Sequence, residues 1–120
     1  GGNVGSYGSV GGHHIHAKAA FKDHDSYDLK KATAISQEYM KKNGFKHHEM
    51  TNYQRQEYKK MKNGDIPSTM DQHNRIAVEA LVAGGVDRQT ARDLTAASLK
   101  NLRKQGVRNA SNIPWGGRIQ

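Results

Sequence analysis

The sequence contains no cysteine, two prolines and few aromatic residues. Without cysteine there is no disulfide framework and no thiolate metal site, so a bound cation would need His, Asp, Glu, Asn or water as ligands. No apolar run is long enough to span a membrane, and no secretory hydrophobic segment is present. The length of 120 residues predicts one domain with a modest core, and the hydrophobic content of 34% is low for a domain.

Acidic residues are also scarce relative to basic ones. The chain has 19 Lys and Arg against 11 Asp and Glu, which gives a formal net charge of +8. Such an excess on a short chain attracts polyanions, and nucleic acid is the first candidate. A merely soluble basic protein would have the same composition, so the charge alone does not define a chemistry.

Several common catalytic motifs are missing as well. There is no P-loop, no G-x-S-x-G and no cysteine nucleophile, and the acids Asp23, Asp25 and Asp28 lack the calcium-loop pattern, so we interpret them as turn formers. Residues 1–12 are half glycine and predict a flexible linker to an upstream region, followed by one domain over 13–120. A chain that starts at Gly1 instead of methionine is also expected to be a piece of a longer protein.

The hydrophobic pattern predicts an α+β fold that is mostly helical, with a small β element near its start. Alternation over 13–21 favours a strand, and 22–28 is a polar turn. Residues 29–44 fit either a helix or a short strand at 32–36 that leads into a helix. Helices are predicted from a capping box at Thr51 to Gly64, from a second box at Ser68 to Gly84, and from Asp87 to Gly106. Ile113 and Trp115 are expected to dock the tail.

Three histidines lie within four positions, at His13, His14 and His16. On a strand, the rings of His13 and His14 point to opposite faces, so one can hold a metal while the other takes a proton from water. His16 would face the same side as His14. Further ligands could come from His73 on the clearest helix, or from His47 or His48 just before Thr51.

A structural interpretation of the same histidines stays open. A lone histidine on an apolar helix face, such as His73, is more often a hydrogen-bonded core residue than a ligand. A pair beside a helix start, such as His47 and His48, is usually surface. The cluster at His13 is harder to explain this way, because it lies within an apolar alternation.

Four segments together carry a family resemblance: "GGHHIHAKAAF", "MTNYQRQEY", "STMDQHNRIAVEALVAGG" and "SLKNLRKQGVRNASNIPW". They resemble the C-terminal toxin domains of bacterial polymorphic toxins, in the group of HNH/endonuclease VII nucleases with an SHH-type signature, often found at the end of Rhs-repeat proteins. The resemblance covers nearly everything after Gly11. One departure is Gly12, which stands where the signature has serine.

The resemblance implies a ββα-metal core in which His13 is a metal ligand and His14 is the general base. His73 and His48 carry over as further metal-ligand candidates, and His16, His47 and Asn74 as accessory ones. The implied cofactor is one divalent cation, Mg²⁺ or Zn²⁺, with Mn²⁺ or Ni²⁺ as alternatives. For the asparagine expected near the end of the second strand, Asn52 and Asn74 are the candidates.

The expected function is a metal-dependent, largely sequence-nonspecific DNA endonuclease that acts as an antibacterial toxin in the cytoplasm of a target bacterium. Its expected partners are DNA, or RNA as an alternative, an upstream Rhs-type carrier chain and an acidic immunity protein. The alternatives are a non-catalytic basic nucleic-acid-binding domain and a ribonuclease toxin. Basic residues expected to contact backbone phosphates are Lys18, Arg55, Lys59, Lys60, Arg103, Lys104 and Arg108.

Overall fold

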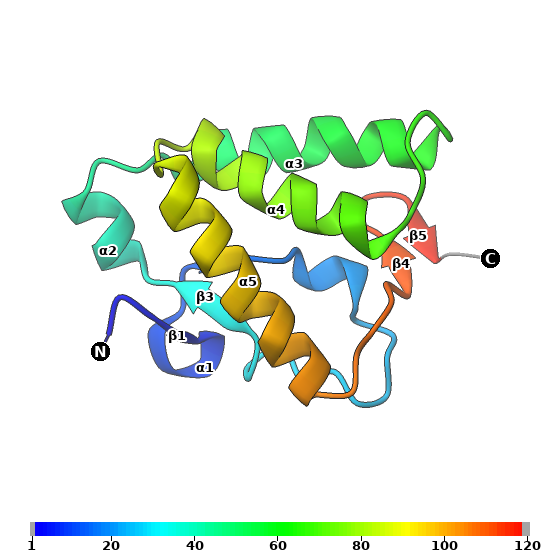
Figure 1. Ribbon diagram of the computed structural model, residues 1–120, viewed down its shortest axis with the longest axis horizontal. Coiled ribbons are helices and arrows are strands. Elements are labelled where there is room, and N and C mark those ends of the chain that lie inside the picture. The colour runs from blue at the N-terminus through cyan, green and yellow to red at the C-terminus, as the bar shows by residue number, and fades with distance from the viewer. Residues whose placement is uncertain (1, 119–120) are drawn as a thin grey trace.

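A computed structural model describes residues 2–118 of the chain. Most of it is helical: α3 (His47–Lys62), α4 (Met70–Ala83) and α5 (Arg88–Lys104) pack against one another, α3 on α4 and α4 on α5. A small sheet lies near one end of α3, and the hairpin of β4 (Asn112–Ile113) and β5 (Gly117–Arg118) lies near the other (Figure 1). The predicted α+β class, mostly helical, is confirmed. No helix within residues 2–118 is long and apolar enough to cross a membrane.

The sheet has three antiparallel strands in the order β1-β3-β2, namely β1 (Val4–Ser6), β2 (His13–His14) and β3 (Thr33–Ile35). A short helix, α1 (Tyr7–Val10), connects β1 to β2. The prediction of a flexible linker over 1–12 is therefore wrong for the described part of that segment. Its glycines allow the tight path from β1 to β2, and β3 supplies hydrogen bonds to both of these strands.

Gly12 has a structural reason to be glycine. Its φ is +85°, and a Cβ placed on it would collide with the carbonyl oxygen of Ile35 in β3. A side chain at this position would push β3 away from the strand that carries His13. A serine, as expected from the resemblance, would not fit this backbone, because the chain approaches β3 closely at the residue before the histidine pair.

The strand predicted over 13–21 is much shorter in the structure. Its partner β3 is only three residues long, and the last pairing bond runs from the amide of Ile15 to the carbonyl of Thr33 at 3.1 Å. Beyond it the chain turns into a 3₁₀ helix, η1 (Lys18–Ala20). Of the two alternatives for 29–44, the strand followed by a helix is confirmed, since β3 leads into α2 (Gln37–Lys42), capped by Ser36.

The helix boundaries correct two predicted caps. Helix α3 begins at His47 after Lys46, so Thr51 and Gln54 lie inside the helix and form no capping box. The cap of α4 is Thr69, one residue after the predicted Ser68. The cap of α5 is Asp87 as predicted, and its carboxylate accepts a hydrogen bond from the amide of Thr90.

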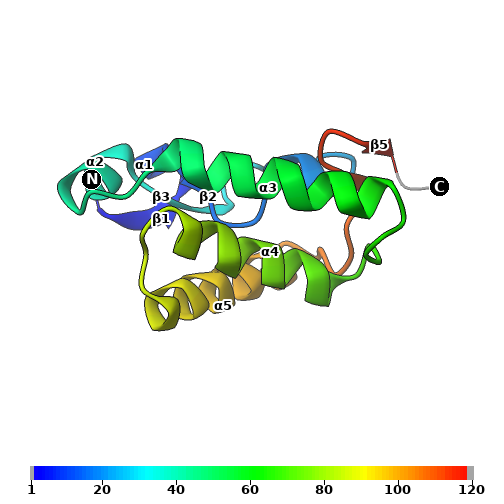
Figure 2. The ribbon, with the colours of Figure 1, turned by 90° about the horizontal axis from the view of Figure 1, so that it is seen from above.

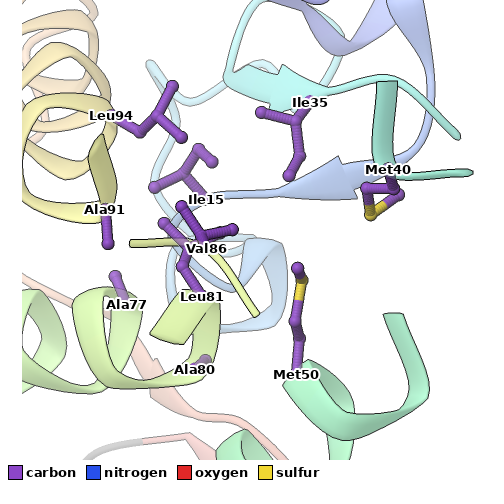
Figure 3. Packing of buried hydrophobic residues seen from close by; sticks show 10 residues of the cluster. All are labelled: Ile15, Ile35, Met40, Met50, Ala77, Ala80, Leu81, Val86, Ala91 and Leu94. Atoms are coloured by element: carbon purple, nitrogen blue, oxygen red, sulfur yellow. The ribbon is translucent and has the colours of Figure 1, made fainter. Parts of the chain in front are cut away.

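The main hydrophobic cluster joins the sheet to the helices (Figure 3). Ile15 and Ile35 from the sheet side meet side chains of α4 and α5, while Met50 contributes from α3. Seen from above, α3 runs along one side of the molecule, with α4 and α5 on the other (Figure 2). The face of α3 turned away from α4 is therefore not covered by α4 or α5 (Figure 2). The buried members of the cluster are Ile15, Ile35, Met40, Met50, Ala77, Ala80, Leu81, Val86, Ala91 and Leu94.

Candidate functional site

A pocket of about 400 Å³ opens where β2, α3 and the C-terminal segment meet. Gly12, His13 and His14 come from the β2 region, while α3 contributes side chains spaced by three or four residues on one helix face. Three of the seven expected catalytic, metal and accessory residues, His13, His14 and His47, therefore line one pocket, which is open to solvent. It is lined by Tyr7, Gly12, His13, His14, Ala17, Lys18, Ala19, His47, Thr51, Gln54, Pro114 and Trp115.

His14 is held in one orientation by two contacts. Its ring stacks on Tyr7 with centroids 4.1 Å apart, and its Nε2 lies 2.9 Å from the carbonyl oxygen of Leu29. Because a carbonyl can only accept, Nε2 must carry the hydrogen, and in the neutral ring Nδ1 keeps a free lone pair. No hydrogen bond within the described chain occupies Nδ1. The contact with Leu29 thus selects the tautomer in which Nδ1 can take a proton.

The environment of His14 also favours its neutral form. Burial lowers the pKa of its imidazole, and the positive charge of Lys18 lowers it further, while the hydrogen bond to Leu29 acts in the opposite direction. The net shift is downward from 6.5. At neutral pH the ring is therefore uncharged and able to accept a proton.

His13 lies beside His47 with an unpaired nitrogen. The residue is 2% exposed, and its Nε2 is buried without a hydrogen-bond partner among the described residues. Its ring meets that of His47 edge-on, with centroids 5.1 Å apart. Burial, and then the proximity of His47 and His14, lower the pKa of His13 to about 3. A buried donor or acceptor without a partner is costly in a protein interior. A bound cation would give this nitrogen the partner that it lacks within the described residues.

The donor set fits a divalent cation in part. Two neutral imidazoles, His13 and His47, are near each other, and Thr51 and Gln54, whose side chains carry oxygens, are lining residues of the same pocket. No group of three His, Cys, Asp or Glu side chains in residues 2–118 is arranged to hold a metal. The protein would thus supply two nitrogen ligands, with hydroxyl, amide or water oxygens for the rest. Imidazole suits Zn²⁺ or Ni²⁺ better than Mg²⁺, which prefers oxygen.

The structure distinguishes the two neighbours at the start of α3. His47 lines the pocket, and burial lowers the pKa of its ring, which favours the neutral form that binds metal. His48 points elsewhere: its side chain is 70% exposed and pairs with Glu49 at 3.1 Å. His48, expected as a ligand, therefore lies outside the site, and His47, expected only as an accessory residue, lies in it.

His73 is also not in the pocket. Its side chain is buried on the apolar face of α4, with Nδ1 3.0 Å from the hydroxyl of Tyr58 and Nε2 3.5 Å from that of Ser68. Both nitrogens thus have partners within the protein. The structural interpretation of this histidine describes it better than the metal-ligand one, because the periodicity that buries it in α4 also directs it away from β2.

His16 and Asn74 belong to a second interior contact. The strand ends before His16, so its ring turns into the space between α4 and α5 instead of following His14. There Nε2 lies 2.8 Å from Oδ1 of Asn74, and Nδ1 lies 2.7 Å from the hydroxyl of Ser98. Neither residue lines the pocket, so the structure does not bring these accessory candidates to the site.

The expected phosphate-binding residues divide into three groups. Lys18 lines the pocket, with its Nζ 5.9 Å from the centre of the Tyr7 ring, and Arg55 and Lys59 line a second pocket farther along α3. Lys60 is paired with Glu57 at 2.8 Å. The remaining three line neither pocket; they lie at the C-terminal end of α5 and just beyond it, as Arg103, Lys104 and Arg108.

Among the lining residues with a polar or aromatic side chain, sequence reasoning missed Tyr7, Thr51, Gln54 and Trp115. Thr51 and Gln54 could have been found, because they follow His47 by four and seven positions on one helix. Tyr7 lay in the segment interpreted as a linker. Trp115 was expected to dock the tail, yet it is 53% exposed.

Comparison of the chain with protein-family models, with curated proteins and with solved structures gives no match.

Proposed function

We propose that the chain is a metal-dependent endonuclease that hydrolyses phosphodiester bonds, with His14 as general base and His13 and His47 as metal ligands. The observation that carries the proposal is the contact between Nε2 of His14 and the Leu29 carbonyl, which frees Nδ1 in the same pocket as the His13 and His47 rings. One imidazole that can take a proton and two that can hold a cation would supply the general base and the metal ligands of metal-assisted hydrolysis.

His14 would act through Nδ1. The neutral ring accepts a proton from a water molecule, and the resulting hydroxide attacks the phosphorus while the bond to the leaving oxygen breaks. The imidazolium formed at His14 keeps its Nε2 hydrogen bond to Leu29, so the ring does not need to reorient. Stacking on Tyr7 fixes the plane of the His14 ring. Lys18, at the pocket wall, neutralises charge on the bound phosphate.

His13 and His47 would hold the cation. When bound, a divalent ion supplies Lewis-acid polarisation of the phosphoryl oxygen and stabilises charge on the leaving oxygen. The two histidines stay neutral at pH 7, since the pKa of each is lowered. Thr51 and Gln54 would orient bound water beside them.

The order of elements supports the proposal. β2 carries the histidine pair, β3 runs antiparallel to it, and after the short helix α2 the long helix α3 places His47 next to His13. This is the order that the resemblance to the toxin nucleases implies, and the net charge of +8 agrees with a polyanionic substrate. On the resemblance alone we further propose a role as a delivered antibacterial toxin acting on DNA, carried by an Rhs-type chain and neutralised by an acidic immunity protein.

The test is cleavage of supercoiled plasmid by the purified chain in Mg²⁺, Mn²⁺, Zn²⁺ or Ni²⁺ and in EDTA. Four proteins are compared: the wild type, His14→Ala, His47→Ala and His48→Ala. We expect nicking that needs metal, that is lost in the first two variants and that remains in His48→Ala. Because His47 and His48 are adjacent on one helix turn, the second is a matched control.

Other outcomes would exclude the proposal. Cleavage that persists in EDTA would favour the metal-free ribonuclease or another chemistry. Intact plasmid in every metal, with retarded migration on a gel, would favour the binding-domain alternative. Equal loss in His47→Ala and His48→Ala would remove the ligand assignment.

A further inference from the structure

A second pocket of about 230 Å³ adjoins the first along α3. Three basic side chains spaced by four and three residues, Arg55, Lys59 and Lys62, form one wall. Tyr58, Pro114 and Trp115 form the rest, and Pro114 and Trp115 also line the first pocket. The two pockets thus share a wall, and one face of α3 runs from the histidines to a basic, aromatic site.

Trp115 has an unusual backbone conformation. It is the only non-glycine residue with positive φ in the described chain, at +62°. It occupies the third position of a turn that begins at Ile113, in which the amide of Gly116 donates to the carbonyl of Ile113 at 2.8 Å. That position normally takes glycine or asparagine when φ is positive, and a bulky aromatic there is disfavoured. Residues kept in such a conformation cluster at functional sites.

The ring of Trp115 is supported from inside the protein and open outside it. It is 53% exposed, the guanidinium of Arg55 lies 5.5 Å from its ring centre, and the ring of Tyr58 lies 6.3 Å away. Tyr58 is itself buried and fixed by the hydrogen bond to His73. A rigid, half-exposed aromatic plane beside a row of cations is the composition of a platform for single-stranded nucleic acid.

We propose that Trp115 stacks on an unpaired nucleobase of the substrate strand, while Arg55, Lys59 and Lys62 bind the neighbouring phosphates. This inference rests on the proposed nuclease function, because that function defines where on the strand the cut is made. Residues 47 and 55 are eight positions apart on α3, roughly 12 Å at about 1.5 Å per residue, so the stacked base would lie a few nucleotides from the cut. Because Trp115 stacks on an unpaired base, the protein binds single-stranded or locally unpaired nucleic acid in preference to uninterrupted duplex.

The test uses Trp115 as its own probe, because it is the only tryptophan in the chain. Its fluorescence is titrated in EDTA with single-stranded DNA of about four, eight and twelve nucleotides and with a twelve-pair duplex, using the full chain with His14→Ala so that nothing is cut. We expect strong quenching by the two longer single strands and weaker quenching by the duplex. The affinity should fall as salt is raised.

Variants separate stacking from charge. Binding of a labelled twelve-nucleotide strand is measured by anisotropy for Trp115→Phe, Trp115→Leu, Lys59→Ala and Lys104→Ala. Loss of the stacking plane in Trp115→Leu should weaken binding roughly tenfold, and Trp115→Phe should recover part of it. Lys59→Ala should reduce the slope of affinity against salt, whereas Lys104→Ala, a cation outside both pockets, should have the smaller effect.

The outcomes distinguish this inference from the nuclease proposal. Quenching without any metal-dependent cleavage keeps the stacking site and rejects the nuclease. Cleavage by the wild type, with equal affinity of Trp115→Leu and wild type and no quenching, rejects the stacking site and keeps the nuclease. Stronger quenching by duplex than by single strand would also overturn the inference.

Discussion

Two pairs of histidines in this chain have opposite surroundings. His16 and His73 are buried between helices with both ring nitrogens close to polar partners. His13 and His14 are also buried, yet each retains a nitrogen without a partner among the described residues, and both line the open pocket. Burial alone therefore does not distinguish the two pairs. They differ in whether the second ring nitrogen has a partner.

The largest expected effect concerns the base. His14→Ala should lower the turnover of plasmid or of a model phosphodiester by about 10²–10⁴-fold, which is the usual contribution of general base catalysis. A retained far-UV circular dichroism spectrum and cooperative melting would show that the variant is folded. Activity within a factor of about three of the wild type would mean that His14 is not the base.

The next effect is the loss of folding stability at low pH that His16 and His73, the two histidines buried between helices, should cause. Burial lowers the pKa of His16 to about 4, and burial followed by the proximity of His16 lowers that of His73 to about 4. In the unfolded chain both titrate near 6.5. As pH falls, the unfolded state therefore binds protons before the folded state does. The free energy of unfolding is highest above about pH 6.5 and falls by a few kcal/mol toward pH 4, at roughly 1.4 kcal/mol per pKa unit.

Urea unfolding at pH 7 and pH 5 measures this loss together with that of buried His13, whose pKa is lowered to about 3. The acid limb of activity reports instead on His14, and its midpoint should lie below 6.5 because the pKa of that ring is lowered. A free energy of unfolding that does not change between pH 7 and pH 5 would show that these buried imidazoles are not kept neutral by the fold.

A smaller effect is expected from the interior partner of His73. Tyr58→Phe keeps the ring that supports Trp115 but removes the hydroxyl next to Nδ1 of His73. A buried nitrogen left unpaired should cost about 1–3 kcal/mol of stability, with no change in turnover at a temperature where the variant is folded. Thermal melting and initial rates check both parts. A tenfold loss of rate in a folded Tyr58→Phe would place His73 in the reaction after all.

The smallest expected effect on stability is at the turn. Trp115→Gly removes the packing of a half-exposed ring but also relieves a disfavoured backbone, worth about 1–2 kcal/mol, so the melting temperature should change by only a few degrees. Binding of single strands should fall as in Trp115→Leu. A large drop in melting temperature would assign Trp115 a structural role in holding the C-terminal segment.

The sequence predicted the helices better than the site. Local signals sufficed for α5, with its cap at Asp87, and for the buried face of α4 that includes His73. The strand at His13 was predicted too long, because the length of β2 is limited by its partner β3, which is distant in sequence. The prediction of a linker over 1–12 was wrong for a related reason. The glycines of this segment allow the backbone to approach β3 closely, and composition does not reveal that contact.

The sequence named some residues that line the pocket, among them His13 and His14, and did not name others. The His13 and His14 pair was found because clustering and alternation are local features. The choice of His47 over His48 and the exclusion of His16 and His73 depend on how α3, α4 and α5 pack. The tautomer of His14 depends on Leu29, fifteen residues away. No pattern within one helix or strand carries that information.

The most direct test of the distinction between the two histidine pairs is a nitrogen-15 NMR spectrum of the histidine rings at pH 7, recorded before and after addition of Zn²⁺. The account predicts the Nε2-protonated tautomer for His14, and metal-induced shifts at His13 and His47 while His16 and His73 remain unchanged. An Nδ1-protonated His14, or shifts centred on the interior pair, would contradict it.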